Sequence, residues 1–325
     1  MVKLPEIKRN IWVLGGTGFI GTALLNHLAE DPANRLHLLV HKNVPYQKLE
    51  KVNLISGSLK RFDYSWFSRY PPDIVFHLAR MAGSGPLRRR LASHIGQQSN
   101  ERLIRFLATL DNPPMIVYVS GSLMYGDQSG SSGADESTAL NPIAYGRYYE
   151  RAERPWISAG RIPGLKVQLV RPGWIVGPGS WFKVFFWDHY LKTGRVPVYG
   201  SGNQLMSLIQ VEDLAVMITK GVEMYPGVLN LFAGNPLTQK EFSEIMAKIL
   251  GVETENISIK SIRRKYGIAE AEALSSSIPM NTRYPELWND LELKYPKPAD
   301  LLNRTISLLK SKKGVFPELP EGSFV

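Results

Sequence analysis

Three glycines follow a short apolar run near the start of the chain, in the sequence IWVLGGTGFIG. They are Gly15, Gly18 and Gly21, and such a run between a strand and a helix is typical of a dinucleotide-binding loop. We expect Gly15 to permit the tight turn, Gly18 to admit a pyrophosphate and Gly21 to let helix and strand pack closely. The amides of Phe19 and Ile20 would meet the phosphates at the helix N-terminus. A glycine turn without a ligand is the alternative.

The residues after the second predicted strand bear on the choice of cofactor. An NAD site calls for an acidic residue about 20 residues beyond the glycines, where it holds the ribose 2′-hydroxyl. This chain has His41 and Lys42 there instead. Because cations suit a 2′-phosphate, we expect NADP(H) to be favoured over NAD(H). The alternative is that both side chains only contact solvent.

The composition narrows the chemistry further. The chain has no cysteine, which removes disulfides and thiolate catalysis, and its six histidines show no metal-binding spacing, so we expect no metal site. The formal charge of +10 suits an anionic ligand, such as a phosphate-bearing cofactor, an acyl-carrier substrate or nucleic acid. No stretch approaches the roughly 20 apolar residues of a membrane span. We therefore expect a soluble, cytoplasmic protein.

Alternating strands and helices must position these residues. The pattern predicts strands over residues 11–14, 36–40, 52–56, 74–77, 115–120 and 165–170, and helices over 18–30, 87–110 and from Tyr145 onward. Near-continuous apolar strands separated by helices indicate a parallel sheet covered on both faces. The predicted fold is α/β, with a Rossmann-type doubly wound parallel sheet.

The alternation of strand and helix patterns ends after Pro172. Residues 177–205 are rich in glycine and aromatic side chains, and helical patterns follow over 211–224, 238–250 and 297–311. We expect an NAD(P)-binding domain over residues 1–175. A smaller C-terminal α/β substrate lobe would occupy mainly residues 176–325, with some segments returning to the first domain.

Several motifs occur in a fixed order along the chain. They are GGTGFIG at 15–21, FHLA at 76–79, YVSGSLMYGD at 118–127, Tyr145, LVRPGWIVGP at 169–178, GSGNQ at 200–204 and VEDLA at 211–215. This ordered set resembles the extended short-chain dehydrogenases/reductases, in the NAD-dependent epimerase/dehydratase-like group. The resemblance implies reductase, epimerase or dehydratase chemistry. It implies further cofactor contacts from Thr17, Ser58, Leu59, Leu78, Ala79, Arg80, Ser120, Tyr145, Pro172, Trp174 and Ile175.

Members of that family use a Tyr-x-x-x-Lys pair and an upstream serine or threonine. The tyrosine is the acid/base, the lysine lowers its pKa and holds the cofactor ribose, and the hydroxyl side chain binds the substrate oxygen. Tyr145 matches the tyrosine, but Tyr149 stands at the lysine position, and no lysine lies between Lys60 and Lys166. Arg147 would face away from Tyr145 on a helix. We therefore predict an active site that has lost its lysine.

The hydroxyl position also departs from the family pattern. Counting back from Tyr125, it falls on Gly121, between Ser120 and Ser122. A small backbone shift would bring Ser122 into use as a catalytic residue. The alternative is a strand-end serine that only satisfies local backbone groups.

Two further departures bear on the substrate. Nucleotide-sugar members carry an arginine shortly before the VxDLA helix, whereas Met206 stands there in this chain, with Arg195 nearby. The aromatic segment WFKVFFWDHY at 181–190 would line an apolar pocket better than a sugar site. Its alternative roles are the lobe's own core or a dimer contact.

Two other groups of residues need no catalytic role. The cluster RRR at 88–90 is expected to be a solvated helix face, with nucleic-acid binding as the less favoured alternative. His77, at the end of a predicted strand, is expected to be a buried imidazole rather than a base.

Three functions remain open. The favoured one is an NADP(H)-dependent oxidoreductase that reduces a carbonyl or enone of a bulky apolar or aromatic metabolite, with Tyr145 as the acid and Ser122 and Tyr149 beside it. The second is a nucleotide-sugar epimerase or dehydratase. The third is a Rossmann protein with a degraded site that acts as a sensor, a scaffold or a repurposed enzyme. The expected partner is a small-molecule substrate, without nucleic acid or membrane, and a homodimer stays open.

Overall fold

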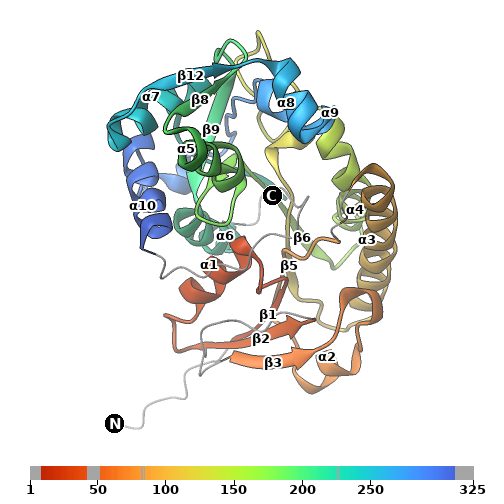
Figure 1. Cartoon of the computed structure of the whole chain (residues 1–325). Coiled ribbons are helices and arrows are strands. Elements are labelled where there is room, and N and C mark those ends of the chain that lie inside the picture. Colours follow the sequence, from red (N-terminus) through yellow and green to blue (C-terminus); the bar gives the residue numbers. More distant parts are fainter. Residues whose placement is uncertain (1–8, 42–51, 82, 84, 225–226, 312–325) are drawn as a thin grey trace, which may run out of the picture.

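The structure, a computed structural model, describes residues 9–41, 52–81, 83, 85–224 and 227–311. Within these residues the chain builds one large sheet of seven strands. They are β1 (Arg9–Leu14), β2 (Asn34–Val40), β3 (Val52–Ser56), β4 (Ile74–His77), β5 (Met115–Val119), β6 (Lys166–Pro172) and β10 (Val228–Leu231). Their order in space is β10-β6-β5-β4-β1-β2-β3, and every neighbouring pair is parallel (Figure 1). This confirms the predicted doubly wound α/β fold.

Helices cover both faces of this sheet. They are α1 (Phe19–Leu28) and α6 (Val211–Met224) on one face, and α2 (Ser65–Arg69), α3 (Gly85–Leu107) and α4 (Ala144–Ala159) on the other. The alternation of β1 explains the two layers. Ile11 and Val13 pack in the cluster that contains α1 and α6, whereas Trp12 and Leu14 pack in the cluster that contains α3 and α4. Burial on both faces is why the strands are almost continuously apolar.

The strand order reverses at β1, with β2 and β3 on one side and β4 to β6 on the other. In open α/β sheets a ligand binds at such a switch point, in the crevice outside the carboxyl ends of the strands. Segments from the second half of the chain extend this sheet or pack on it. They include β10, at the edge of the sheet, α6, which packs on α1, and Leu287, which is buried in the same cluster.

The second lobe contains two small sheets. One is β11 (Ala233–Thr238), β9 (Leu205–Gln210) and β7 (Trp174–Val176), and the other is β12 (Thr254–Ile257) and β8 (Val196–Tyr199). Its helices are α5 (Asp188–Thr193), α7 (Gln239–Leu250), α8 (Ile259–Tyr266), α9 (Ile268–Ser275) and α10 (Pro298–Lys310). In the part of the chain described, no helix combines the length and apolar character needed to cross a membrane.

The aromatic segment at 181–190 mainly builds the core of this lobe. Trp181, Phe182 and Phe186 pack around Phe242 of α7, with ring centroids 5.1–6.1 Å from it. Phe185 and Trp187 are buried in the same cluster. Of the roles left open by the sequence, the lobe's own core is the one that most of these rings have, and Trp181 also lines a pocket.

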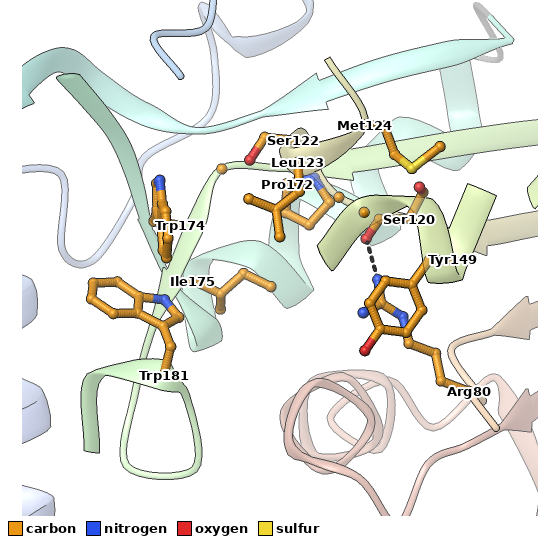
Figure 2. A pocket seen from close by; sticks show the side chains of 13 residues that line it. Arg80, Ser120, Ser122, Leu123, Met124, Tyr149, Pro172, Trp174, Ile175 and Trp181 are labelled. Atoms are coloured by element: carbon orange, nitrogen blue, oxygen red, sulfur yellow. Dashed lines mark hydrogen bonds between the residues drawn. The ribbon is translucent and has the colours of Figure 1, made fainter. Parts of the chain in front are cut away.

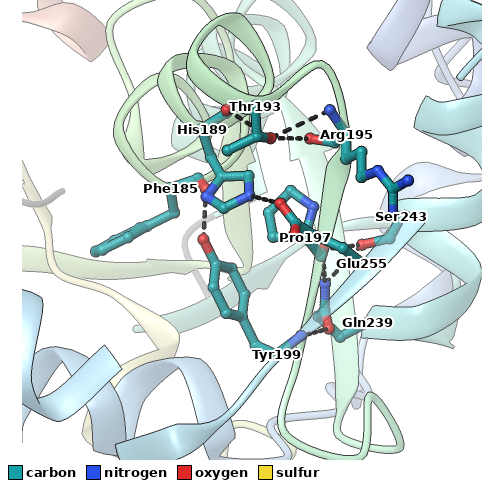
Figure 3. Close-up of polar contacts among 9 residues, drawn as sticks. All are labelled: Phe185, His189, Thr193, Arg195, Pro197, Tyr199, Gln239, Ser243 and Glu255. Atoms are coloured by element: carbon teal, nitrogen blue, oxygen red, sulfur yellow. Dashed lines mark hydrogen bonds and ion pairs between the residues drawn. The ribbon is translucent and has the colours of Figure 1, made fainter. Parts of the chain in front are cut away.

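His189 belongs to a polar network that joins the lobe's elements (Figure 3). Its Nε2 lies 2.5 Å from Glu255 Oε1 on β12, and the Tyr199 hydroxyl of β8 donates to the carbonyl oxygen of Phe185. Gln239 of α7 accepts a hydrogen bond from the Tyr199 amide at 2.8 Å. The hydrogen bond to His189 lowers the pKa of Glu255. His189 is thus part of the lobe's framework.

Candidate active site at the carboxyl edge of the sheet

The glycine loop follows β1 and has geometry that other residues would disturb. Gly15 has a φ of 92°, and a Cβ there would lie 2.5 Å from the amide nitrogen of Ala79. A Cβ on Gly21 would lie 2.3 Å from the carbonyl oxygen of Gly15. The first glycine therefore allows the loop to contact the end of β4, and the last brings α1 against the loop.

The N-terminus of α1 is open to a ligand. Gly18 is its N-cap, is exposed, and supplies no capping side chain, and the first turn has no acidic residue. The amides of Phe19 and Ile20 begin the helix, while their side chains are buried. Unpaired amides and the helix dipole favour an anion at this point, so a dinucleotide pyrophosphate fits the loop.

The other cofactor candidates follow the carboxyl ends of neighbouring strands. Exposed His41 follows β2, and Lys42 lies outside the described residues. The remaining candidates lie after β3 (Ser58, Leu59), after β4 (Leu78, Ala79, Arg80), after β5 (Ser120), at the end of β6 (Pro172) and in β7 (Trp174, Ile175), and Thr17 lies in the glycine loop. Because β1 to β6 are parallel, their carboxyl ends share one edge of the sheet, and β7 begins two residues after β6, so the structure brings these residues to one side of the sheet.

A pocket lies at this edge, with about 520 Å³ of space unoccupied by atoms and partly open to solvent (Figure 2). Its walls are Arg80, Ser120, Gly121, Ser122, Leu123, Met124, Gly146, Tyr149, Pro172, Gly173, Trp174, Ile175 and Trp181. Figure 2 shows Trp174 and Trp181 on one side and Arg80, Ser120 and Tyr149 on the other. One side of the pocket is thus aromatic and the opposite side is polar.

The two tyrosines of α4 form a hydrogen-bonded pair. Tyr149 lines the pocket, and its hydroxyl donates to the Tyr145 hydroxyl at 3.0 Å. Tyr145 is only 2% exposed and packs against Ile143 and Ala273. The side chain at the family's lysine position therefore faces the pocket, and the family's tyrosine lies buried in contact with it.

Two arginines from outside α4 approach this pair. The Arg80 guanidinium carbon lies 4.2 Å from the centroid of the Tyr149 ring, and that of Arg89 lies 5.1 Å from the Tyr145 ring. Arg89 also pairs with Glu270 of α9 at 2.7 Å. Burial acts to lower the pKa of Arg89, but the hydrogen bond and charge of Glu270 raise it overall.

The Arg89 contact corrects the expectation of a solvated RRR face. The Arg89 side chain is only 11% exposed, whereas Arg88 and Arg90 are exposed. The sequence holds no local signal for this contact, because Glu270 is 181 positions away. Arg80 was expected only as a cofactor contact, and its stacking on Tyr149 was likewise not foreseen.

The two serines differ in what their hydroxyls do. Ser120 donates to Glu153 of α4, and Glu153 pairs with buried Arg171 of β6 at 2.7 Å. Ser122 opens the 3-10 turn η2 (Ser122–Met124), is 4% exposed, lines the pocket, and has no side-chain hydrogen bond with another residue in the described ranges. Of the two, Ser122 has the hydroxyl available to a ligand.

Several residues singled out in the sequence lie away from the pocket. Met206 is buried in the lobe core, and Arg195 pairs with Glu253 on the surface at 3.5 Å. His77 is buried, with its Nε2 2.9 Å from Asn100 Oδ1, and burial lowers its pKa to about 4. His77 is therefore neutral near pH 7, as expected of a buried imidazole.

Comparisons with known proteins agree with this architecture. A family model described as the NAD dependent epimerase/dehydratase family matches residues 11–230. Epimerase family protein SDR39U1 of Bos taurus is 26% identical over 255 residues, covering 74% of this chain and 80% of that protein.

Solved structures show the same fold at lower identity. Human SDR39U1 (isoform 2) with NADPH has a TM-score of 0.74 at 22% identity, covering 92% of this chain and 99% of that one. dTDP-glucose 4,6-dehydratase from Bacillus anthracis in complex with NAD has a TM-score of 0.75 at 18% identity. The match covers 95% of this chain and 98% of that one.

Proposed function

Because the chain belongs to the NAD dependent epimerase/dehydratase family, we propose that it is an NADP(H)-dependent reductase of a bulky apolar or aromatic carbonyl or enone. The observation that carries the proposal is the two-sided pocket. Trp174 and Trp181, whose rings meet edge to face at 75°, offer an apolar wall, and Tyr149 and Ser122 offer hydroxyls to a substrate oxygen. Mostly apolar pockets with a few placed polar groups suit this class of ligand.

The choice of NADP(H) rests on the end of β2. His41 stands there in place of the acidic residue that binds a ribose 2′-hydroxyl, and Lys42 follows it in the sequence. The human relative with a similar fold was solved with NADPH, which supports the same choice. The loop at Gly15 to Gly21 would hold the pyrophosphate, and the side chains after β4 and β6 would flank the rest of the cofactor.

NADPH supplies the hydride when it is bound. Ser122 would donate a hydrogen bond to the substrate oxygen and fix its position. The Tyr149–Tyr145 pair would give that oxygen a proton, because a phenol hydroxyl can act as a general acid. When one hydroxyl has lost its proton, the other can stabilise the phenolate by donating a hydrogen bond to it. The indole rings would hold the apolar body and exclude water.

Two observations lead us to propose an apolar substrate rather than a nucleotide sugar. Met206, at the position of the family's diphosphate-binding arginine, is buried in the lobe core. The aromatic wall offers no charge to a diphosphate, and among the described pocket residues Arg80 is the cation, on the opposite side.

Two probe substrates test the proposal. Purified protein is mixed with NADPH or NADH and with 2′-acetonaphthone, an aromatic ketone, or chalcone, an aromatic enone. We expect NADPH consumption with at least one probe, weaker consumption with NADH, and loss of activity in Tyr149→Phe. In parallel, a panel of UDP- and dTDP-sugars is screened by chromatography. An epimerised or dehydrated sugar, with neither probe reduced, would overturn the proposal.

A further inference from the structure

We propose that Arg80 is a positioning residue that stabilises the phenolate formed on the Tyr149–Tyr145 pair when the pair gives up a proton. The inference deepens the proposed function and rests on it for the proton's destination. It depends on three observations: the stacking of Arg80 on Tyr149, the charge state of the surrounding arginines, and the anchoring of Arg80 at the sheet edge.

The first observation is the stacking. Arg80 follows β4, and its guanidinium carbon lies 4.2 Å from the centroid of the Tyr149 ring. A cation over an aromatic face is attracted to the ring's π electrons, and a negative charge on the ring strengthens that attraction. The phenol oxygen is attached to this ring, and an opposite charge within about 4–6 Å favours the ionised form of a phenol.

The second observation is that the Arg80 charge is uncompensated. Arg89 pairs with Glu270 and Arg171 with Glu153, each at 2.7 Å. Arg80 has no carboxylate partner in the described part of the chain. Its Nη2 donates instead to a neutral group, the carbonyl oxygen of Ser120, at 3.1 Å. Of these three arginines, Arg80 therefore adds net positive charge beside the pocket.

The Arg80 charge also acts on the pKa of a neighbouring tyrosine. Burial raises the pKa of Tyr118, on β5, and the Arg80 charge opposes that rise. The Arg80 charge therefore acts on the phenol of Tyr118, on the strand next to β4.

The third observation is the anchoring. The Ser120 amide donates to the carbonyl oxygen of Val170 at 2.8 Å, and the Ser120 hydroxyl donates to buried Glu153. The group that holds Arg80 is therefore fixed to β6 on one side and to α4 on the other. A fixed cation stabilises a developing charge without having to reorient during the reaction.

This arrangement offers a physical substitute for a lysine on α4. A lysine at position 149 would place its charge on the same helix as Tyr145. In this chain the charge comes from the loop after β4 and acts through the ring at position 149. Both arrangements place a cation close to the tyrosines of α4.

The test follows tyrosine ionisation in the unliganded protein. Near-ultraviolet absorbance is recorded during a rising pH titration, and the signal of the pair is identified as the part lost in Tyr149→Phe. In Arg80→Leu we expect that ionisation to move up by about one pH unit, a tenfold change in the proton equilibrium. Arg80→Lys should restore most of the shift. Arg90→Leu, which removes an exposed charge from α3, should titrate like the parent. A parent-like titration of Arg80→Leu would overturn the inference.

Arg80→Gln serves if Arg80→Leu fails to fold, because it keeps a donor for the Ser120 carbonyl and removes only the charge. It should shift the ionisation as Arg80→Leu does. The second test measures probe reduction with NADPH. Arg80→Leu should lower it and Arg80→Lys should restore most of it, whereas unchanged reduction in Arg80→Leu would contradict the role.

The outcomes separate this inference from the proposed function. The titration needs neither cofactor nor substrate, so a shifted ionisation supports the role of Arg80 even if no probe is reduced. If Arg80→Leu weakens NADPH binding while the ionisation stays at the parent pH, Arg80 is a cofactor ligand and the inference is wrong.

Discussion

Glu272 Oε2 accepts a hydrogen bond of 2.8 Å from the backbone amide of Ala144, the first residue of α4. The N-cap of α4 is Ile143, whose side chain cannot accept a hydrogen bond. Glu272, a residue of the lobe helix α9, therefore caps the N-terminus of α4, a role that a serine or aspartate at the N-cap position usually has. Because α4 carries Tyr145 and Tyr149, this contact connects the lobe to the tyrosines of the proposed site.

We expect Glu272→Ala to lose about 1 kcal/mol of folding free energy, the usual effect of removing an N-cap. The loss is measured as a shift in the urea unfolding midpoint. Activity should fall further than stability explains, because the start of α4 is then held less firmly. Glu244→Ala, an exposed glutamate on α7, is the matched control and should leave both nearly unchanged. Equal effects of the two variants would contradict the capping role.

The buried pair between Glu153 and Arg171 should be much more important for stability than an exposed pair on the same helix. Breaking a buried pair leaves an uncompensated charge and costs about 3–5 kcal/mol, so Glu153→Ala is expected to be strongly destabilised. Glu150 pairs with Arg154, whose side chain is 69% exposed. Glu150→Ala should cost at most about 1 kcal/mol. Chemical denaturation of both variants checks the difference, and similar losses would contradict it.

His77 should make the fold sensitive to acid. Burial lowers its pKa to about 4 from a usual 6.5. Below pH 6.5 the unfolded chain binds a proton that the folded chain does not, so stability falls until the pH reaches about 4. Between pH 7 and pH 5 this one group should remove about 2 kcal/mol.

The comparison for His77 is His77→Gln, which keeps a polar partner for Asn100. Its unfolding free energy should change less between pH 7 and pH 5 than that of the parent. If the two proteins lose the same stability over this range, His77 is not the acid-sensitive group.

Cofactor choice should depend on the residues after β2. We expect the parent to bind NADPH more tightly than NADH, since charge-assisted contacts to a 2′-phosphate are worth about 1.5–3 kcal/mol. His41→Asp combined with Lys42→Ala should reverse the preference. Lys166→Ala, at the opposite end of the sheet in β6, removes a charge as a control and should not change it. Fluorescence titration with both cofactors gives the answer, and equal affinities in the parent would contradict the prediction.

Much of the first domain could be predicted from the sequence because its signals are local. The predicted strands 52–56 and 74–77 coincide with β3 and β4. The glycine loop also depends on residues adjacent in sequence. By contrast, β7, β9 and β11 pair over long separations, such as Trp174 with Leu208 and Leu237 with Met206, and show no clear alternation. They were not predicted.

The candidate site was predictable only in part, for the same reason. The loss of the lysine can be read directly at position 149, but the cation that approaches Tyr149 comes from Arg80, 69 positions earlier by their residue numbers. The aromatic segment had three open roles because composition does not say which way a ring points. Only packing shows that Trp181 reaches the pocket while Phe182 and Phe186 fill the lobe.

The destination of the hydride tests the central claim most directly. The protein is supplied with NADPH deuterated on the transferring face of nicotinamide C4, and the product of 2′-acetonaphthone or chalcone is analysed by mass spectrometry. The proposed reductase predicts one deuterium bound to carbon in the product and an equal amount of NADP⁺. A protein that leaves both probes unreduced, and converts a nucleotide sugar with no net change in the cofactor, would contradict it.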